Sequence, residues 1–194
     1  MLAATSMEIA DLLPYDFFII TQFSESMTHL RKFFFVYPSG EMKSYVRWWE
    51  ISKPLRDGFK RQARGGRAAR TEIVEDYEAF LNLQTHRGLK ALPEFQWVQA
   101  EGFKSSLTHF VAHEGRLLAS IALLSKTKQA YREDHARLIA ELPLDKVVLT
   151  AIRSEQKRAE HFRLELLHEM VKTCDSVGQV AHAVVDGIGK GHLW

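Results

Sequence analysis

Four arginines that recur at every third position around a pair of glycines are the pattern in this sequence that most resembles a binding site. The set comprises Arg61, Arg64, Gly65, Gly66, Arg67 and Arg70. A guanidinium group binds phosphate or carboxylate through two parallel hydrogen bonds, and glycines let backbone N–H groups approach an anion closely. The segment is therefore a candidate anion site. A solvated helix face followed by a loop explains the same residues, because charge runs usually face water.

Aromatic residues on both sides of this basic segment can form the walls of a pocket. Ligand sites combine apolar walls with a few fixed polar groups. We therefore predict that a ligand, if one binds, lies between the sheet and segment 43–100 and is anionic or aromatic. The predicted contacts are Trp48, Trp49, Arg67, Arg70, Trp97 and His109. Aromatic residues also fill protein cores, so part of this set must be core.

Residues that could support catalysis or hold a metal do not form a coherent set. His109 and His113 fall on a predicted strand and its turn, where positions four apart are separated by about 13 Å, too far for one ion. A strand histidine is more often satisfied by polar neighbours than bound to haem. Ser105-Ser106 lack the strand–turn–helix context of a nucleophile. We expect a non-catalytic protein without a metal site, and the sequence identifies no cofactor.

Composition narrows the class of protein further. The chain has 194 residues, of which 46% are hydrophobic and 26% charged, as in soluble globular proteins. Its apolar runs are far shorter than the ~20 residues that span a bilayer, and no secretory signal begins the chain. The single cysteine, Cys174, excludes an internal disulfide, and a net charge of +2 gives no global attraction to nucleic acid or membrane. We therefore expect a cytoplasmic protein with no membrane contact.

Hydrophobic periodicity and turn residues predict an α+β fold. The predicted strands are 15–23, 30–37, 43–51, 70–74, 103–112 and 116–124. The predicted helices are 2–12, a helix that Ser52 caps and that stops at Gly65, 77–84 capped by Asp76, 94–101, 133–142 and 144–173. Because short turns join neighbouring strands, we expect a five- or six-stranded antiparallel sheet with helices on both faces.

Several segments between residues 102 and 139 resemble the C-terminal half of a GAF domain. The residues that carry the resemblance are Gly102-Phe103-Lys104-Ser105-Ser106-Leu107, the hairpin Glu114–Ser125, Ala130–Asp134 and Leu138-Ile139, and the segment Leu12–Phe23 resembles the entry to the family's first strand. The resemblance covers roughly residues 8–142. Two departures are Ala119, where the family usually has glycine, and segment 43–100, which matches no family pattern.

What the resemblance implies is a small-molecule sensor or a dimerisation module within a larger signalling protein. Bilin-binding members attach the chromophore through a cysteine near the pocket. Cys174 lies instead in the C-terminal tail, which disfavours covalent bilin binding.

The segment 144–173 predicts a long helix with one apolar stripe near the coiled-coil period. The stripe comprises Val148, Ile152, Ala159, Phe162, Leu166 and Met170. A helix of about 45 Å extends beyond a small domain, so its far end needs a partner. We predict a homodimer through this stripe, and a helix that folds back on its own domain is the alternative. The predicted organisation is a sensor domain over 1–142, a signalling helix over 143–174 and a helical tail over 175–194.

These features predict a regulatory sensor domain that binds a small molecule or partner and signals through a dimeric C-terminal helix. Such a domain would serve a downstream output domain in a signalling or transcription-regulatory protein. A dimerisation or partner-binding module without a small ligand is an alternative. A nucleic-acid-binding module that uses Lys53–Arg70 is a weaker one, which salt-dependent affinity would reveal.

Overall fold

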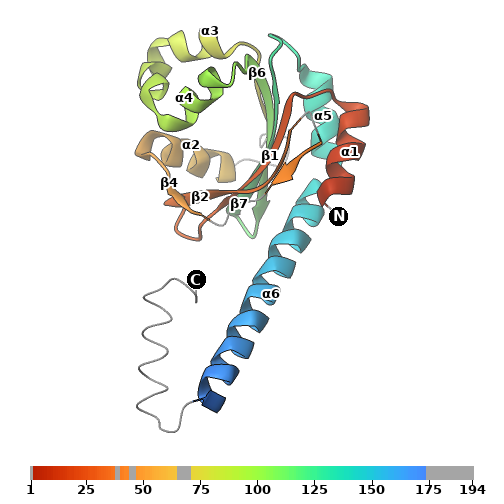
Figure 1. Cartoon of the computed structure of the whole chain (residues 1–194). Coiled ribbons are helices and arrows are strands. Elements are labelled where there is room, and N and C mark those ends of the chain that lie inside the picture. Colours follow the sequence, from red (N-terminus) through yellow and green to blue (C-terminus); the bar gives the residue numbers. More distant parts are fainter. Residues whose placement is uncertain (1, 38–39, 44–46, 65–70, 174–194) are drawn as a thin grey trace. The chain divides into compact units, whose positions relative to one another are not determined.

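The computed structural model describes residues 2–37, 40–43, 47–64 and 71–173. The chain divides into two compact units, Met1–Val148 and Leu149–Trp194. The first unit holds the sheet and most of the helices, and the described part of the second is the remainder of helix α6, Leu144–Thr173 (Figure 1). Arg67 and Arg70, together with the predicted tail 175–194, lie outside the described residues.

An antiparallel sheet forms the centre of the first unit. Its strands are β1 (Phe17–Phe23), β2 (His29–Val36), β3 (Met42–Lys43), β4 (Trp49–Glu50), β5 (Thr71–Val74), β6 (Ser105–His113) and β7 (Arg116–Ser125). Across the described residues the order is β3-β2-β1-β7-β6-β5, and β4 also pairs with β2. Five longer strands therefore form most of the sheet. The two-residue strands β3 and β4 both pair with the outer edge of β2. The predicted antiparallel α+β sheet is confirmed.

The described residues of the predicted strand 43–51 pair with β2 in two short pieces, while β2 itself carries a bulge toward β1. Ile20 pairs with Phe34 and Thr21 with Lys32, which leaves Phe33 as an extra residue. On the other edge of β2, β3 pairs with Phe35 and Val36, whereas β4 pairs with His29 and Leu30. Lys43 and Trp49 are six positions apart, whereas their partners Phe35 and Leu30 are five apart, so the segment 43–49 has one more residue than the stretch of β2 that it faces. The extra residue lies on this segment and not in β2, so 43–51 cannot pair with β2 as one regular strand, independently of the bulge at Phe33.

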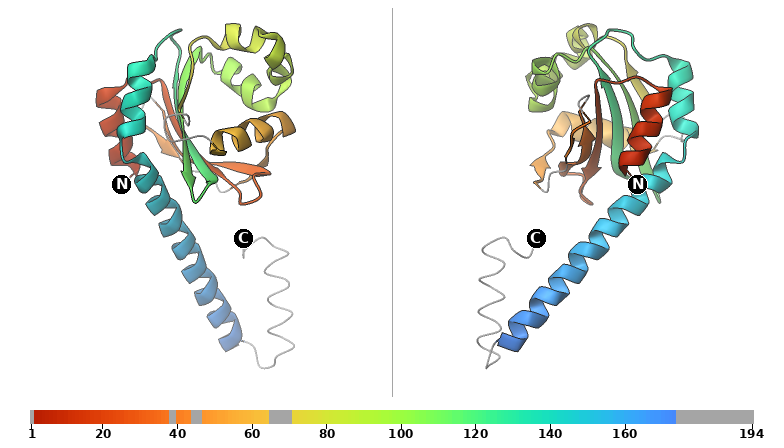
Figure 2. Two further views of the ribbon diagram at one scale, coloured as in Figure 1. Left: turned by 180° about the vertical axis from the view of Figure 1, so that it is seen from behind. Right: turned by 45° about the vertical axis from the view of Figure 1, so that its right-hand side comes forward.

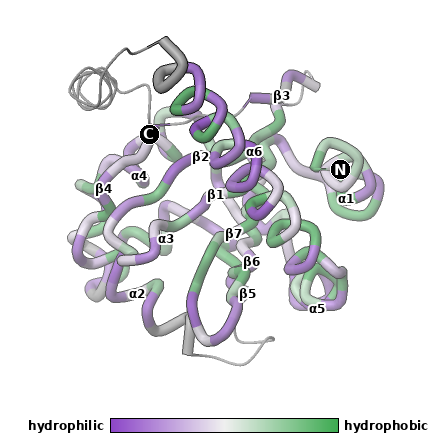
Figure 3. The backbone as a smooth tube through the Cα atoms, turned by 90° about the horizontal axis from the view of Figure 1, so that it is seen from below, coloured by the Kyte–Doolittle hydropathy of each residue, from purple (hydrophilic) through white to green (hydrophobic). Residues whose placement is uncertain are grey.

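Helices cover both faces of the sheet, as predicted (Figures 1 and 2). On one face lie α2 (Lys53–Arg64), α3 (Tyr77–Asn82), the 3-10 helix η2 (Gln84–Ala91) and α4 (Pro93–Ala100), and on the other lie α1 (Leu2–Leu12) and α5 (Glu133–Glu141). Figure 3 shows the same two layers from below, with α1 and α5 on one side of the strands and α2 and α3 on the other. None of the helices that the structure describes combines the length and the apolar content needed to cross a membrane.

The face under α2, α3 and α4 is filled by aromatic side chains, which we call the aromatic cluster. It comprises Phe17, Ile19, Phe35, Val74, Tyr77, Val98, Phe103 and Leu124, with Tyr37, Phe80, Phe95, Trp97 and Ala122 packed against it. Alternate residues of β1 enter this face, because side chains alternate along a strand. The ring of Phe17 lies 5.2 to 5.7 Å from the rings of Phe35, Tyr37, Trp97 and Phe103. Phe23, Phe110 and Phe59 of α2 continue the packing along the same face.

Two predicted helix caps have different outcomes. The Asp76 carboxylate accepts hydrogen bonds from the backbone N–H groups of Glu78 and Ala79, at 2.9 and 3.3 Å, so the predicted cap of α3 is confirmed. At α2, the N–H of Arg56 donates to the Ser52 carbonyl at 3.0 Å. The Ser52 hydroxyl, however, is buried without a hydrogen-bond partner among the described residues, so the side-chain cap is not made.

Candidate functional site

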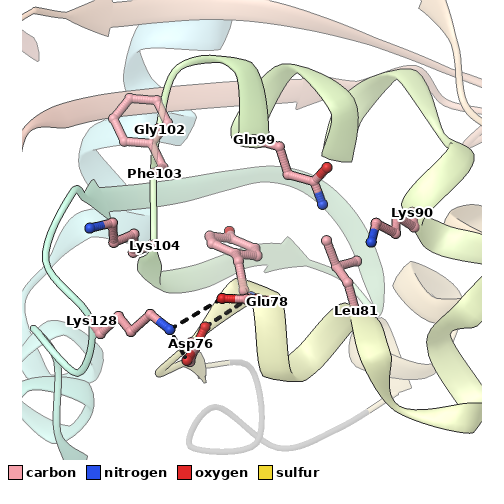
Figure 4. A pocket seen from close by; sticks show the side chains of 10 residues that line it. Asp76, Glu78, Leu81, Lys90, Gln99, Gly102, Phe103, Lys104 and Lys128 are labelled. Carbon is pink, nitrogen blue, oxygen red and sulfur yellow. Dashed lines mark hydrogen bonds and ion pairs between the residues drawn. The ribbon is translucent and has the colours of Figure 1, made fainter.

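An open cleft of about 320 Å³ lies between α3, the end of α4 and the start of β6 (Figure 4). Its lining comprises Asp76, Tyr77, Glu78, Leu81, Lys90, Gln99, Gly102, Phe103, Lys104 and Lys128. Gly102 adopts a left-handed backbone, with φ of 78°, and reverses the chain between α4 and β6. The cleft lies between segment 43–100 and the sheet, where the sequence predicts a ligand, although its lining residues differ from the predicted ones.

Lys128 fixes one wall of the cleft. Its ammonium nitrogen lies 2.7 Å from Asp76 Oδ2 and 3.4 Å from Glu78 Oε2. The hydrogen bond from Lys128 holds the pKa of Asp76 below its ordinary value, and the same bond raises the pKa of Lys128. The backbone N–H of Gln129 also donates to the Glu75 carbonyl at 2.7 Å. The loop between β7 and α5 is therefore tied to the start of α3.

Two further lysines give the cleft positive charge. Lys90 and Lys104 lie at opposite ends of it (Figure 4), and no carboxylate of the described residues lies within ion-pair distance of either. Gln99 adds an amide, which both donates and accepts hydrogen bonds. The largely buried side chains of Leu81 and Phe103 form the apolar part of the lining. The lining can thus bind an anionic group at its lysines and an apolar group on its walls.

Tyr77 is a structural member of the cleft. Its hydroxyl donates to Ser106 Oγ at 2.8 Å, and burial raises the pKa of the phenol to about 12. The phenol therefore stays neutral near pH 7. The lining that the structure describes includes no histidine, cysteine or serine that could act as a base or nucleophile. Within the described ranges, no group of three or more acidic, histidine or cysteine side chains is arranged to hold a metal ion.

Trp48 and Trp97, both predicted ligand contacts, lie on opposite faces of the sheet. The Lys32 ammonium lies 4.1 Å from the ring centroid of Trp97, which also packs on the aromatic cluster. The Arg31 guanidinium lies 5.1 Å from the ring centroid of Trp48, which is 40% exposed. Because Arg31 and Lys32 are consecutive in β2, their side chains point to opposite faces.

His109 is fully buried on the face opposite the cleft. Its Nε2 lies 3.1 Å from Asp145 Oδ1 and its Nδ1 lies 2.9 Å from Thr71 Oγ1. Ser106, which bonds Tyr77 beneath the cleft, is three residues earlier in β6, so the two side chains point to opposite faces. Trp49 is partly buried opposite Leu30 at the far edge of the sheet. Trp48 packs on β2, and β1 and β7 separate β2 from β6, so the structure brings none of Trp48, Trp97 and His109 together.

Sequence reasoning missed the cleft because its lysines come from separate elements. Lys90 ends η2, Lys104 precedes β6 and Lys128 follows β7. Asp76 was predicted only as a helix cap, although its second carboxylate oxygen also binds Lys128. The one local signal near the cleft is Gly102, a glycine directly before a strand.

The predicted dimer stripe divides into a buried and an exposed part. Val148 and Ile152 are already buried in the single chain, with exposed fractions of 1% and 5%. Ala159 is exposed, Phe162 is 62% exposed and Leu166 is half-buried. The side chain of Met170 lies outside the described part. A contact between two copies would therefore begin after Ile152.

Comparison with known proteins identifies the fold. No protein-family model and no curated protein matches the chain. The GAF domain of a two-component sensor histidine kinase from Bacillus halodurans is 16% identical, with a TM-score of 0.54, and the match covers 79% of this chain and 93% of that one. A red/green cyanobacteriochrome in its red light-absorbing state is 16% identical, with a TM-score of 0.57 and coverage of 80% and 94%.

The chromophore-binding domain of an unusual bacteriophytochrome from R. palustris is also similar. It is 12% identical, with a TM-score of 0.50, and the match covers 80% of this chain and 54% of that one. The chain thus spans about half the length of that structure. These likenesses show a GAF-like fold, and the resemblance found in the sequence is confirmed at the level of the fold.

Proposed function

We propose that this chain is a non-catalytic sensory domain that binds a small anionic molecule in the cleft and signals through a dimer of α6. The observation that carries the proposal is a GAF-like sheet whose chain continues, through α5, into a helix of 30 residues. Beyond Ile152 most side chains of this helix are exposed. Such a helix does little for the stability of its own domain, but it can connect the domain to a second copy and to a following module.

The ligand is assigned from the lining of the cleft. Lys90 and Lys104 would bind a carboxylate or phosphate, and Leu81 and Phe103 would contact the apolar part of the molecule. Direct pairing with an ammonium group strengthens hydrogen bonds to an anion. The alternative that Arg67 and Arg70 bind the anion stays a prediction, because both residues lie outside the described part.

A calorimetric screen of dicarboxylates, nucleoside monophosphates and aromatic carboxylates tests this assignment. We expect at least one class to bind, and Lys90→Ala or Lys104→Ala to weaken it by about two- to tenfold, as expected for partly exposed charge pairs. Lys126→Ala is the matched control, because this nearby exposed lysine does not line the cleft. If no member of the screen binds, the small-ligand function is wrong. If binding survives both cleft substitutions but not Arg67→Ala, the anion site is in the basic segment.

The dimer is assigned from the exposed part of the stripe. Phe162 and Leu166 are four residues apart and therefore share one face of α6. We expect Leu166→Glu to give a monomer, because a symmetric contact would bury the introduced charge twice. Light scattering over a hundredfold range of concentration measures this. If the wild-type chain stays monomeric over this whole range, the proposed signalling dimer is wrong.

A further inference from the structure

A buried chain of hydrogen bonds joins the edge of the sheet to the first turn of α6. His109 has no exposed surface and bonds Thr71 on one side and Asp145 on the other. A carboxylate only accepts hydrogen bonds, so His109 Nε2 carries a hydrogen and donates it to Asp145. With a neutral ring, the Thr71 hydroxyl then donates to Nδ1. Both ring nitrogens are satisfied in this arrangement.

The fold alone does not require a polar residue at position 109. Leu107 and Val111 point to the same face of β6, and both are buried and apolar. An apolar side chain at position 109 would continue their packing. A buried polar group in an otherwise apolar layer instead favours one arrangement of its partners, because any other arrangement leaves it unsatisfied. His109 therefore specifies where Asp145 lies.

Asp145 belongs to the short part of α6 that is buried in the first unit. Leu144 and Val148 stand on either side of it, with exposed fractions of 2% and 1%. Side chains one position before and three positions after Asp145 thus supply apolar contacts, and Asp145 supplies a directional one. From Arg153 onward the helix is mostly exposed. The first turn therefore determines whether α6 stays attached at its start.

The other end of the hydrogen-bond chain lies on the strand that leads to the cleft. Thr71 begins β5, an edge strand that pairs with β6 alone in the described sheet. Two residues after the end of β5, Asp76 lines the cleft and binds Lys128. A short strand that is held on one side only moves at lower cost than a central one. A displacement at the cleft can therefore reach Thr71 through four residues of β5.

We propose that the chain Thr71–His109–Asp145 couples the cleft to α6. In one state the His109–Asp145 bond is made and the first turn of α6 is packed on the sheet, and in the other the bond is broken and this turn is released. Movement of β5 at the cleft shifts the balance between the two states. The cleft's role as the sensory site and α6's role as the output rest on the proposed function. The attachment of α6 by His109 is a property of the chain without any ligand.

Hydrogen exchange measured by mass spectrometry on the full chain tests the attachment. His109→Leu replaces the ring by an apolar side chain, and Asp145→Ala removes the partner without altering the core at position 109. We expect either variant to speed exchange of the amides of residues 147–153 by about fivefold or more, while β6 and β7 keep their protection. Glu133→Ala is the matched control, because it removes an exposed first-turn acid from α5, another helix of the same unit. This control should leave α6 unchanged.

A second arm tests the coupling to the cleft without a ligand. Lys128→Met breaks the ion pairs to Asp76 and Glu78 and retains a side chain of similar length. We expect it to speed exchange at residues 147–153 in the native background and to have little further effect in the Asp145→Ala background.

Three results would overturn the proposal. Unchanged exchange in α6 in whichever of the His109 and Asp145 variants folds would show that the bond does not hold the helix. Equal acceleration throughout β6, β7 and α6 would show a purely structural role. An equal effect of Lys128→Met in both backgrounds would show that the cleft and the bond are independent. A ligand screen that finds no binder would contradict the proposed function and leave these exchange results unaffected.

Discussion

Replacing Phe162 by alanine should separate the stability of the domain from the stability of the dimer. The side chain is 62% exposed in the single chain, so its removal should change the free energy of unfolding of the monomer by less than about 0.5 kcal/mol. Complete burial of a phenylalanine contributes about 1.5–3 kcal/mol, and burial of the exposed 62% contributes roughly 1–2 kcal/mol per chain. In a symmetric dimer the same side chain is buried on both chains, so this free energy is doubled. Phe162→Ala should then weaken dimerisation by about 2–4 kcal/mol, or roughly 30- to 700-fold in Kd.

Sedimentation equilibrium measures this dimerisation constant directly. Leu164→Ala is the matched control, because Leu164 is 59% exposed and lies two positions away, on nearly the opposite side of the helix. Its substitution should change the Kd by less than about threefold, as for a residue outside the contact. If the two variants weaken the dimer equally, the stripe is not the contact. If neither does, copies associate elsewhere or not at all.

Three further predictions concern the domain itself. Phe17→Ala should lower the free energy of unfolding by about 3–5 kcal/mol in urea titrations, because it removes the ring at the centre of the aromatic cluster, and a loss under 1 kcal/mol would contradict that packing. The lowered pKa of Asp76 makes its contribution to stability present at neutral pH and lost as pH falls below the ordinary carboxyl range. The stability difference between the wild type and Asp76→Asn should therefore shrink between about pH 5 and pH 2, and a difference that is constant with pH would refute the pairing. Gly102→Ala should destabilise the domain by about 1–2 kcal/mol in the same titrations, since space for the methyl group is open but φ is +78°, and an unchanged midpoint would argue against this backbone.

Locally determined elements were predictable from the sequence. The helix over 144–173 and the cap at Asp76 depend on periodicity and on one side chain, and both are found as predicted. The hairpin of β6 and β7 follows from two apolar strands around His113-Glu114-Gly115. The prediction of a single strand over 43–51 was wrong although the alternation is regular, because the segment is one residue longer than the stretch of β2 that it faces, and its local pattern carries no sign of that difference.

The candidate site was much less predictable, because its contacts join distant parts of the chain. His109 and Asp145 are 36 positions apart, and nothing in either local pattern indicates that they meet. Trp48 and Trp97 formed a plausible pair by type alone. They lie on two faces because Trp48 packs on Arg31 and Trp97 packs on Lys32, and these consecutive residues of β2 point to opposite faces. The types of the side chains indicate which chemistry is available. Strand register decides which of these side chains lie together.

The extra residue Phe33 constrains how this gene can tolerate insertions and deletions. Removing it would restore an unbroken ladder along β2, because Lys32 would then adjoin Phe34 directly, as their partners Thr21 and Ile20 adjoin one another in β1. Residues 29–32 would keep their faces, so the Arg31 guanidinium would stay bonded to Gln22, now at 2.7 Å, and Leu30 would stay opposite Phe23. Shortening β2 by one codon should therefore be tolerated at or next to Phe33, whereas a deletion farther along β2 would turn the residues between the gap and Phe33 to the other face. Homologous sequences that are one residue shorter across residues 29–36 should place the gap at or next to position 33.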